Sequence, residues 1–282
     1  MARRSYPVAG RVVLITGAAR GIGASLAREL ARRGARLALV GLEPERLAET
    51  AEAVPGEAKW FEADVTDGPA LERAVAGTVQ NLGGIDVVVA NAGIEAVGTV
   101  ETIDPALFER VIEVNLLGVW RTVRAALPHV IERRGYVLPI ASAAAAAHLG
   151  MMASYAASKA GVEAFADSLR QELDGTGARV GCGYFSFLDT DMVSEAFAHP
   201  AAAKAREGIR GPLARVYPLD EAVVSMADDI ERRARVVAYP GWVRGVLLAR
   251  GVLQPLTEPI TGRRSRDAVR LANELARSQQ RG

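Results

Sequence analysis

The stretch Thr16-Gly17-Ala18-Ala19-Arg20-Gly21-Ile22-Gly23 decides the fold, because it joins a short apolar run directly to a helical pattern. Its three glycines let the chain turn tightly and let the backbone approach a bulky anion. The helix that follows offers free N–H groups and the positive end of its dipole to a pyrophosphate. The sequence therefore predicts a strand, a phosphate-binding turn and a helix in immediate succession.

Outward from this turn, short apolar runs alternate with longer amphipathic segments. Strands are predicted at Arg11–Thr16, Arg36–Gly41, Ala58–Glu62, Ile85–Ala90, Tyr136–Ala141 and Arg179–Tyr184, and helices at 22–33, 45–53, 68–82, 104–133 and 153–174. Continuous apolar strands indicate a parallel sheet that is buried on both faces, and the alternation indicates βαβ units. We expect an α/β fold: a doubly wound, Rossmann-type parallel sheet of about seven strands, with ligands at the carboxyl ends of the strands.

The pattern after residue 190 is less regular. It predicts helices at 191–208 and 219–233 and a last strand at Arg235–Tyr239. No repeat or linker divides the chain, so residues 1–282 are expected to form a single domain. Within it, 240–282 is a divergent C-terminal region, and its Gly262–Arg266 stretch is predicted to be a solvated loop.

Composition excludes several classes of function. Half of the 282 residues are hydrophobic, and the formal net charge is only +1, so no attraction to nucleic acid is expected. The single cysteine, Cys182, cannot form an intrachain disulfide, and the three histidines show no metal-binding spacing. The apolar run Val12–Ile15 is too short for a signal peptide or a membrane span, which predicts a cytoplasmic protein.

The glycine spacing T-G-x(3)-G-x-G resembles the cofactor loop of the short-chain dehydrogenase/reductase family. Further matches follow in chain order, namely Asp64-Val65, Asn91-Ala92-Gly93, Asn115, Ser142 and Tyr155-Ala156-Ala157-Ser158-Lys159. The resemblance covers about residues 8–195 and implies a hydride transfer between a nicotinamide cofactor and an alcohol or carbonyl. It also implies a set of cofactor-binding residues: Gly17, Arg20, Gly21, Ile22, Gly23, Glu43, Asp64, Val65, Asn91, Ala92, Gly93, Tyr155, Lys159 and Thr190.

Four residues are the candidate catalytic group. Tyr155 and Lys159 lie four apart on a helical pattern and so share a face. A nearby ammonium is expected to lower the pKa of the tyrosine from about 10, which would make Tyr155 a general acid and base. Ser142 is expected to hydrogen-bond the same substrate oxygen, and the resemblance gives Asn115 a water that links Lys159 to solvent. Only three of the 34 basic residues are lysines, which supports a specific need for Lys159.

Cofactor choice depends on the end of the second strand. A carboxylate there binds the ribose hydroxyls of NAD and repels the 2′-phosphate of NADP, but the matching position is Gly41. Arg20 resembles a basic residue that is common in NADP-dependent members. Glu43, two residues after Gly41, could still reach the ribose. The sequence therefore favours NADP(H) slightly, with NAD(H) as the alternative.

The substrate pocket is expected to be built from 93–99, 143–152 and 186–212, with 191–212 as a mobile lid. His148, Met151, Met152 and Phe187 are its predicted lining. Small and apolar residues dominate, and no Arg or Lys lies in 141–158, which disfavours phosphorylated or polycarboxylate substrates. We expect a small apolar ketone or alcohol.

Other readings stay open at this point. Helices 104–133 and 153–174 resemble those that pair subunits in the family, which predicts a homodimer or homotetramer. A non-catalytic dinucleotide-binding sensor or scaffold could use the same fold. A lipid or sterol reductase resting on a membrane through 242–255 is a further alternative, although membrane contact is disfavoured. Two departures from the family are Phe185-Ser186, in place of its Pro-Gly, and Pro139 inside the fifth strand.

Overall fold

The computed structural model describes residues 5–207, 209 and 211–279. Its main sheet has six parallel strands in the order β3-β2-β1-β4-β5-β6, and β7 pairs with β8 beside it. The strands are β1 (Val12–Thr16), β2 (Arg36–Gly41), β3 (Ala58–Glu62), β4 (Val87–Ala90), β5 (Tyr136–Pro139), β6 (Arg179–Val180), β7 (Cys182–Phe185) and β8 (Val236–Tyr239). The predicted Rossmann-type sheet is confirmed.

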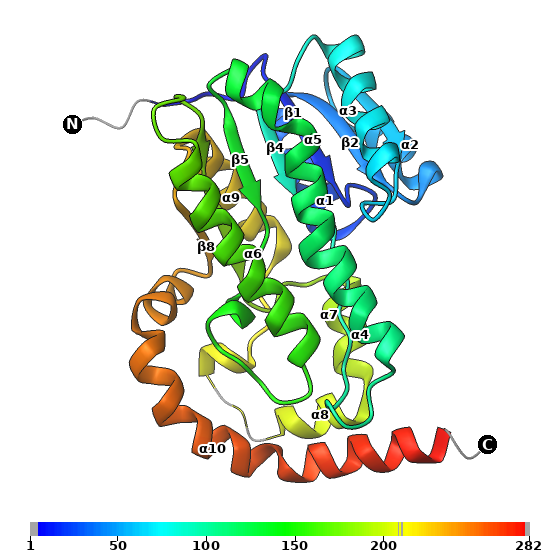
Figure 1. The fold of residues 1–282 in the computed structure, drawn as a ribbon, viewed down its shortest axis with the longest axis vertical. Helices are drawn as coiled ribbons and strands as arrows, with labels where there is room; N and C mark the ends of the chain where they lie inside the picture. Colours follow the sequence, from blue (N-terminus) through cyan, green and yellow to red (C-terminus); the bar gives the residue numbers. More distant parts are fainter. Residues whose placement is uncertain (1–4, 208, 210, 280–282) are drawn as a thin grey trace.

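Helices cover both faces of the sheet, and each face has its own apolar core. One core involves α1 (Gly21–Arg32), α2 (Pro44–Ala53) and α9 (Leu219–Glu231), and the other involves α3 (Gly68–Leu82), α5 (Gly118–Glu132) and α6 (Ala153–Glu172). The remaining helices gather beyond the carboxyl ends of the strands (Figure 1), namely α4 (Pro105–Ile112), α7 (Asp191–Ala198), α8 (Pro200–Arg206) and α10 (Trp242–Gln279). That end is where a doubly wound fold places its ligand.

The strand predicted at Arg179–Tyr184 is two strands, because pairing changes partner at Gly181. A Cβ atom on Gly181 would lie 2.0 Å from the hydroxyl oxygen of Tyr136 and 2.5 Å from the carbonyl oxygen of Ala234. Only glycine fits this close approach of three backbone segments. The break turns the chain from β5 toward β8.

Pro139 lies beside this break. Tyr136 and Ile140 donate their N–H groups to β4, and alternate residues of a strand face opposite neighbours, so the nitrogen of Pro139 faces the β6–β7 side. There the ladder is already interrupted at Gly181. The missing N–H of the proline therefore costs little at this position.

Two further predictions differ from the structure. The predicted helix 104–133 is divided by a π-helical turn at Glu113–Leu117, which the 3.6-residue pattern does not reveal. The predicted loop at Gly262–Arg266 is part of α10. Ala268 and Ala272, one turn apart on α10, are buried against Ala201 of α8, and this packing stabilises a helix whose local composition does not favour one.

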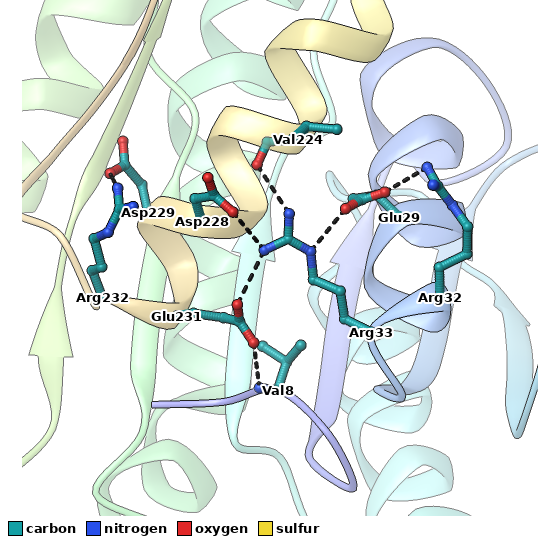
Figure 2. A network of polar contacts seen from close by, with 9 residues as sticks. All are labelled: Val8, Glu29, Arg32, Arg33, Val224, Asp228, Asp229, Glu231 and Arg232. Atoms are coloured by element: carbon teal, nitrogen blue, oxygen red, sulfur yellow. Dashed lines mark hydrogen bonds and ion pairs between the residues drawn. The ribbon is translucent and has the colours of Figure 1, made fainter. Parts of the chain in front are cut away.

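Arg33 ties α1 to α9 (Figure 2). Its guanidinium donates hydrogen bonds to the carboxylates of Glu29 at 2.8 Å, Asp228 at 2.7 Å and Glu231 at 3.0 Å. Glu231 in turn accepts the N–H of Val8 at 3.1 Å. The Arg33 side chain is 19% exposed, so water replaces these bonds poorly. The network joins the N-terminal segment to α1 and α9.

We predict that Arg33→Ala lowers the free energy of unfolding by about 2 kcal/mol, because it leaves several carboxylates partly buried without their main partner. Arg32→Ala is the matched control, since the Arg32 side chain is 66% exposed and forms an ion pair with Glu29 alone. Its effect should stay below about 0.5 kcal/mol. Urea unfolding measures both, and equal losses would contradict the role given to Arg33.

Candidate functional site

The glycine-rich turn leaves the N-terminus of α1 free. No side chain caps the helix at Arg20, and no acidic residue lies in its first turn. Gly21 has φ +55°, and the nearest atom to a Cβ placed there is the Thr190 methyl at 3.8 Å. A Cβ on Gly23 would lie 2.2 Å from the Gly17 carbonyl oxygen. The turn therefore forms an open cradle of N–H groups that fits the pyrophosphate of a dinucleotide.

The loops after β1 and β4 are held together by Thr16 and Asn91. The Asn91 amide donates to the carbonyl oxygens of Thr16 at 3.0 Å and Gly17 at 3.2 Å. The Thr16 hydroxyl oxygen accepts the N–H groups of Asn91 and Ala92. A Cβ on Gly17 would lie 2.8 Å from the Ala92 Cα. The predicted Asn91-Ala92-Gly93 segment thus packs directly against the predicted phosphate loop.

Asn115 lies in the π-helical turn and is fully buried. Its side-chain oxygen accepts the N–H of Ile94 at 2.8 Å, and its amide donates to the Ile94 carbonyl oxygen at 2.8 Å and to the Ser158 hydroxyl at 3.2 Å. The side chain therefore fixes the loop after β4 against the catalytic helix α6. This is a positioning contact that the sequence pattern alone could not show.

Tyr155, Lys159 and Ser142 come together as the sequence predicted. Tyr155 and Lys159 project from α6, and the Lys159 Nζ lies 5.6 Å from the centre of the Tyr155 ring. Lys159 is 3% exposed and donates to the Ile140 carbonyl oxygen at 2.9 Å. Ser142 follows two residues later, near enough to the Tyr155 hydroxyl to lower its pKa. The segment that follows β5 therefore positions both Lys159 and Ser142 near Tyr155.

The expected lowering of the Tyr155 pKa is not found in the protein alone. Burial raises the pKa of Tyr155 well above its ordinary value, and the negative charge of Glu95 raises it further, while the bond from Ser142 lowers it. Burial also lowers the pKa of Lys159 to about 8, against the opposing influence of Cys182 and Glu95. The physical cause is the apolar surrounding, which disfavours both the phenolate of Tyr155 and the ammonium of Lys159.

Glu95 is a site residue that the sequence analysis did not single out. It lies next to Ile94 on the loop after β4 and interacts electrostatically with both Tyr155 and Lys159. Burial raises its pKa to about 7, with Lys159 opposing the shift. A signal was present in the sequence, because Glu95 falls within the predicted pocket segment 93–99 and directly follows the predicted cofactor motif.

Arg20 and Glu43, expected to compete over cofactor choice, are bonded to each other. Arg20 Nε donates to Glu43 at 3.1 Å, and Arg46 pairs with the same carboxylate at 3.2 Å. A Cβ on Gly41 would meet only ordinary contacts, the nearest being Leu47 at 3.5 Å. The end of β2 therefore carries two arginines for one carboxylate and has room for a further side chain.

The predicted pair Asp64-Val65 has two different surroundings. Val65 is buried in the core against Gly118, which has no space for a Cβ. Asp64 accepts bonds from the Thr66 N–H and from Arg110. Burial raises the pKa of Asp64, but these bonds outweigh it and hold that pKa below its ordinary value. Ile22 is partly buried at the start of α1.

The predicted lining residues have different surroundings. Met151 is buried against α8 and α10, whereas His148 is exposed and bonded to Gln254 at 2.6 Å. Met152 lies beside Gly98, to which it is bridged. Phe187 stacks on Phe197 of α7 with ring centres 5.0 Å apart. A hollow of about 450 Å³ lies by the lid and is lined from 189–197 and 215–218, away from Tyr155.

The predicted lid segment 191–212 contains α7, α8 and the start of a short 3₁₀ turn, while Gly208 and Arg210 fall outside the described residues. α10 runs beneath α8 (Figure 1) and reaches the loop after β4, where Thr99 donates to Asn273 at 2.6 Å. Thr190, the N-terminal cap of α7, faces the phosphate turn. The C-terminal helix thus contacts both the predicted lid segment and the loop after β4.

Comparison with known proteins agrees with this geometry. The model of the family described as short chain dehydrogenase matches residues 11–201. The chain belongs to the short-chain dehydrogenase family. Among the described residues of this short-chain dehydrogenase, no three His, Cys, Asp or Glu side chains are grouped to hold a metal ion. None of its described helices combines the length and the apolar character needed to cross a bilayer.

Several relatives of this dehydrogenase have descriptive names. It is 34% identical over 226 residues to cis-4-hydroxycyclohexanecarboxylate dehydrogenase of Sinomonas cyclohexanicum, covering 78% of this chain and 90% of the relative. It is 35% identical over 211 residues to an uncharacterized NAD-dependent oxidoreductase of Mycobacterium tuberculosis, covering 68% and 77%. A putative gluconate dehydrogenase from Agrobacterium tumefaciens has a TM-score of 0.75 at 25% identity, covering 84% and 97%. The dehydrogenase is therefore an oxidoreductase of CH–OH or C=O groups.

We predict that Asn115→Leu lowers the free energy of unfolding by about 3 kcal/mol, because the N–H and carbonyl of Ile94 both lose their partner. Asn81→Leu is the matched control, since the Asn81 amide is on the surface of α3 and donates only to Gly77. Its effect should stay within about 0.5 kcal/mol. Calorimetric unfolding of both variants checks the expectation, and a small loss for Asn115→Leu would contradict it.

Proposed function

We propose that this dehydrogenase transfers a hydride between a nicotinamide dinucleotide and a small alcohol or ketone, with Tyr155 as the general acid and base. The observation that carries the proposal is the convergence of Tyr155, Ser142 and Lys159 beyond the end of β5, next to an uncapped helix N-terminus. A proton donor, a hydrogen-bond donor and an anion cradle are the parts that carbonyl reduction requires.

The residues present fit the cofactor. The free N–H groups at Gly21, the positive φ there and the lack of an acidic side chain in the first turn suit a pyrophosphate. Thr190 faces this turn and is the candidate partner of the carboxamide. When bound, the nicotinamide supplies the hydride acceptor or donor, and its oxidised ring adds positive charge to the site.

The chain's own residues handle the proton. The Ser142 hydroxyl lies near that of Tyr155, whose pKa it lowers, so one substrate oxygen can approach both hydroxyls. In carbonyl reduction Tyr155 donates its proton to that oxygen, and in alcohol oxidation it removes one. Lys159, held by the Ile140 carbonyl, favours the phenolate form when charged. Asn115 fixes the surrounding loop, and a water that it could hold would connect Lys159 to solvent.

We predict that Tyr155→Phe lowers turnover by about 100-fold or more, the usual weight of general acid catalysis. Cofactor affinity should stay near normal because the ring and its packing remain. Steady-state rates with a panel of ketones, together with titration of the reduced cofactor, measure the two effects separately. Turnover equal to that of the wild type would overturn the assignment of Tyr155.

We also propose that the enzyme prefers NADP(H), with NAD(H) as the weaker alternative. Arg20 and Arg46 flank the end of β2, and their shared partner Glu43 balances only one of the two charges. No carboxylate at Gly41 repels a 2′-phosphate. The relative from M. tuberculosis that is named NAD-dependent supports the alternative, NAD(H).

This preference predicts a higher kcat/KM for NADPH than for NADH with one ketone substrate. Gly41→Asp, for which the structure has room, should shift the ratio toward NADH by about 10-fold or more, since a charged repulsion replaces open space. Glu43→Gln should shift it toward NADPH by freeing Arg20. A wild type that strongly prefers NADH, together with a Glu43→Gln variant that loses this preference, would make Glu43 the selector instead.

Several expectations stay predictions. They are the mobility of 191–212, the divergent role of 240–282, the pairing of copies through α5 and α6, and a cytoplasmic location. The sensor or scaffold reading explains neither the buried Lys159 nor the placement of Ser142 against Tyr155. One observation favours the alternative of an enzyme at a membrane surface: Leu248, Val252 and Leu256 of α10 are exposed. Nothing places a lipid there.

A further inference from the structure

The loop after β4 places Glu95 beside the proposed proton donor. Ile94 is fixed on both sides by the Asn115 amide, and a Cβ on Gly93 would lie 3.2 Å from the Asn115 oxygen and 3.5 Å from the Lys159 Nζ. Farther along, the Gly98 N–H donates to the Met151 carbonyl at 2.9 Å. Glu95 therefore sits on a segment held at one end by Asn115, which also bonds to Ser158 of α6, and at the other by Met151, just before α6 begins.

The carboxylate of Glu95 has no hydrogen-bond or ion-pair partner among the described residues, although it is half-buried. Its charge acts on Tyr155 and Lys159, and Lys159 already donates to the Ile140 carbonyl. In 143–152, a second segment of the predicted pocket, every residue except His148 is small or apolar and none is Arg or Lys. The Glu95 oxygens are not among the fully enclosed, unpartnered polar atoms, so a bound molecule can reach them and supply a hydrogen-bond donor.

We propose that Glu95 is the specificity residue of this enzyme: it binds a hydroxyl or ammonium group beside the reacting carbon of the substrate and rejects substrates with a carboxylate. The proposal rests on the proposed oxidoreductase function and narrows its substrate class from plain apolar alcohols to diols, hydroxyketones or amino alcohols. It also separates this chain from its relative named for a hydroxycyclohexanecarboxylate, since two like charges in one apolar pocket repel each other.

The chemistry of Glu95 suits this role. Burial raises its pKa to about 7, so near neutral pH both the carboxylate and the carboxylic acid are present. The carboxylate accepts a hydrogen bond from a hydroxyl or ammonium, and the acid still donates one to a hydroxyl oxygen. No proton of the hydride-transfer reaction has to pass through Glu95. The residue binds the substrate and orients it toward Tyr155.

Binding of alcohols to the enzyme with reduced cofactor tests the proposal without turnover, because alcohol and reduced cofactor cannot react with each other. The probes are cyclohexanol, cyclohexane-1,2-diol, cyclohexane-1,4-diol and cis-4-hydroxycyclohexanecarboxylate, titrated calorimetrically. We expect at least one diol to bind about 10-fold or more tighter than cyclohexanol, the usual weight of a hydrogen bond to a charged group. The carboxylate should bind no tighter than cyclohexanol.

Variants separate the hydrogen bond from the charge. Glu95→Leu should bring the diols and cyclohexanol within about 2-fold of each other. Glu95→Gln should keep part of the diol preference and gain affinity for the carboxylate. Glu109→Leu, which removes an exposed carboxylate from α4, is the matched control and should leave every ratio unchanged.

A wild type that does not favour either diol, or a Glu95→Leu variant with an unchanged ratio, overturns the role of Glu95. Failure of the proposed oxidoreductase function gives a different result. It appears as absence of cofactor binding before any alcohol is added, or as an active Tyr155→Phe enzyme. The alcohol titrations can be repeated on the protein alone, so they judge Glu95 in either case.

Discussion

The buried amide of Asn115 connects three segments that lie far apart in the sequence. It satisfies both backbone groups of Ile94 and donates to Ser158, so the loop after β4, the π-helical turn and the helix α6 form one unit. An amide is suited to this place because it accepts and donates at once, and its burial makes each lost bond costly. The positions of Glu95, Lys159 and Tyr155 relative to the cofactor cradle all depend on this side chain.

A second constraint comes from desolvation. The apolar surroundings of α6 raise the pKa of Tyr155 and lower that of Lys159, so burial makes both groups harder to charge in the protein alone. Glu95, whose pKa is about 7, brings a negative charge into the same space. The site is therefore electrostatically incomplete, and a positively charged cofactor ring and a polar substrate group would both stabilise it. The charge of Glu95 would therefore act both on a bound substrate and on the proposed proton donor Tyr155.

The C-terminal helix α10 lies outside the segment that matches the family and contacts elements near the candidate site. The family match ends at residue 201, whereas α10 continues to Gln279 and packs through Ala268 and Ala272 on α8. Its Asn273 and Arg277 also bond to the loop after β4. The same helix therefore contacts the predicted lid segment and the segment that follows Glu95.

The sequence by itself determined the sheet, the glycine cradle and the Ser142, Tyr155 and Lys159 group, because strand alternation, glycine spacing and helical periodicity are local signals. Tertiary structure alone decided the π-helical turn at Asn115, the break at Gly181 and the helical state of Gly262–Arg266. Each of these depends on contacts with segments distant in the chain. The pairing of Arg20 with Glu43 and the unpartnered state of Glu95 are of the same kind. A residue's type was visible in the sequence, but its partner, or the lack of one, is a property of three-dimensional packing.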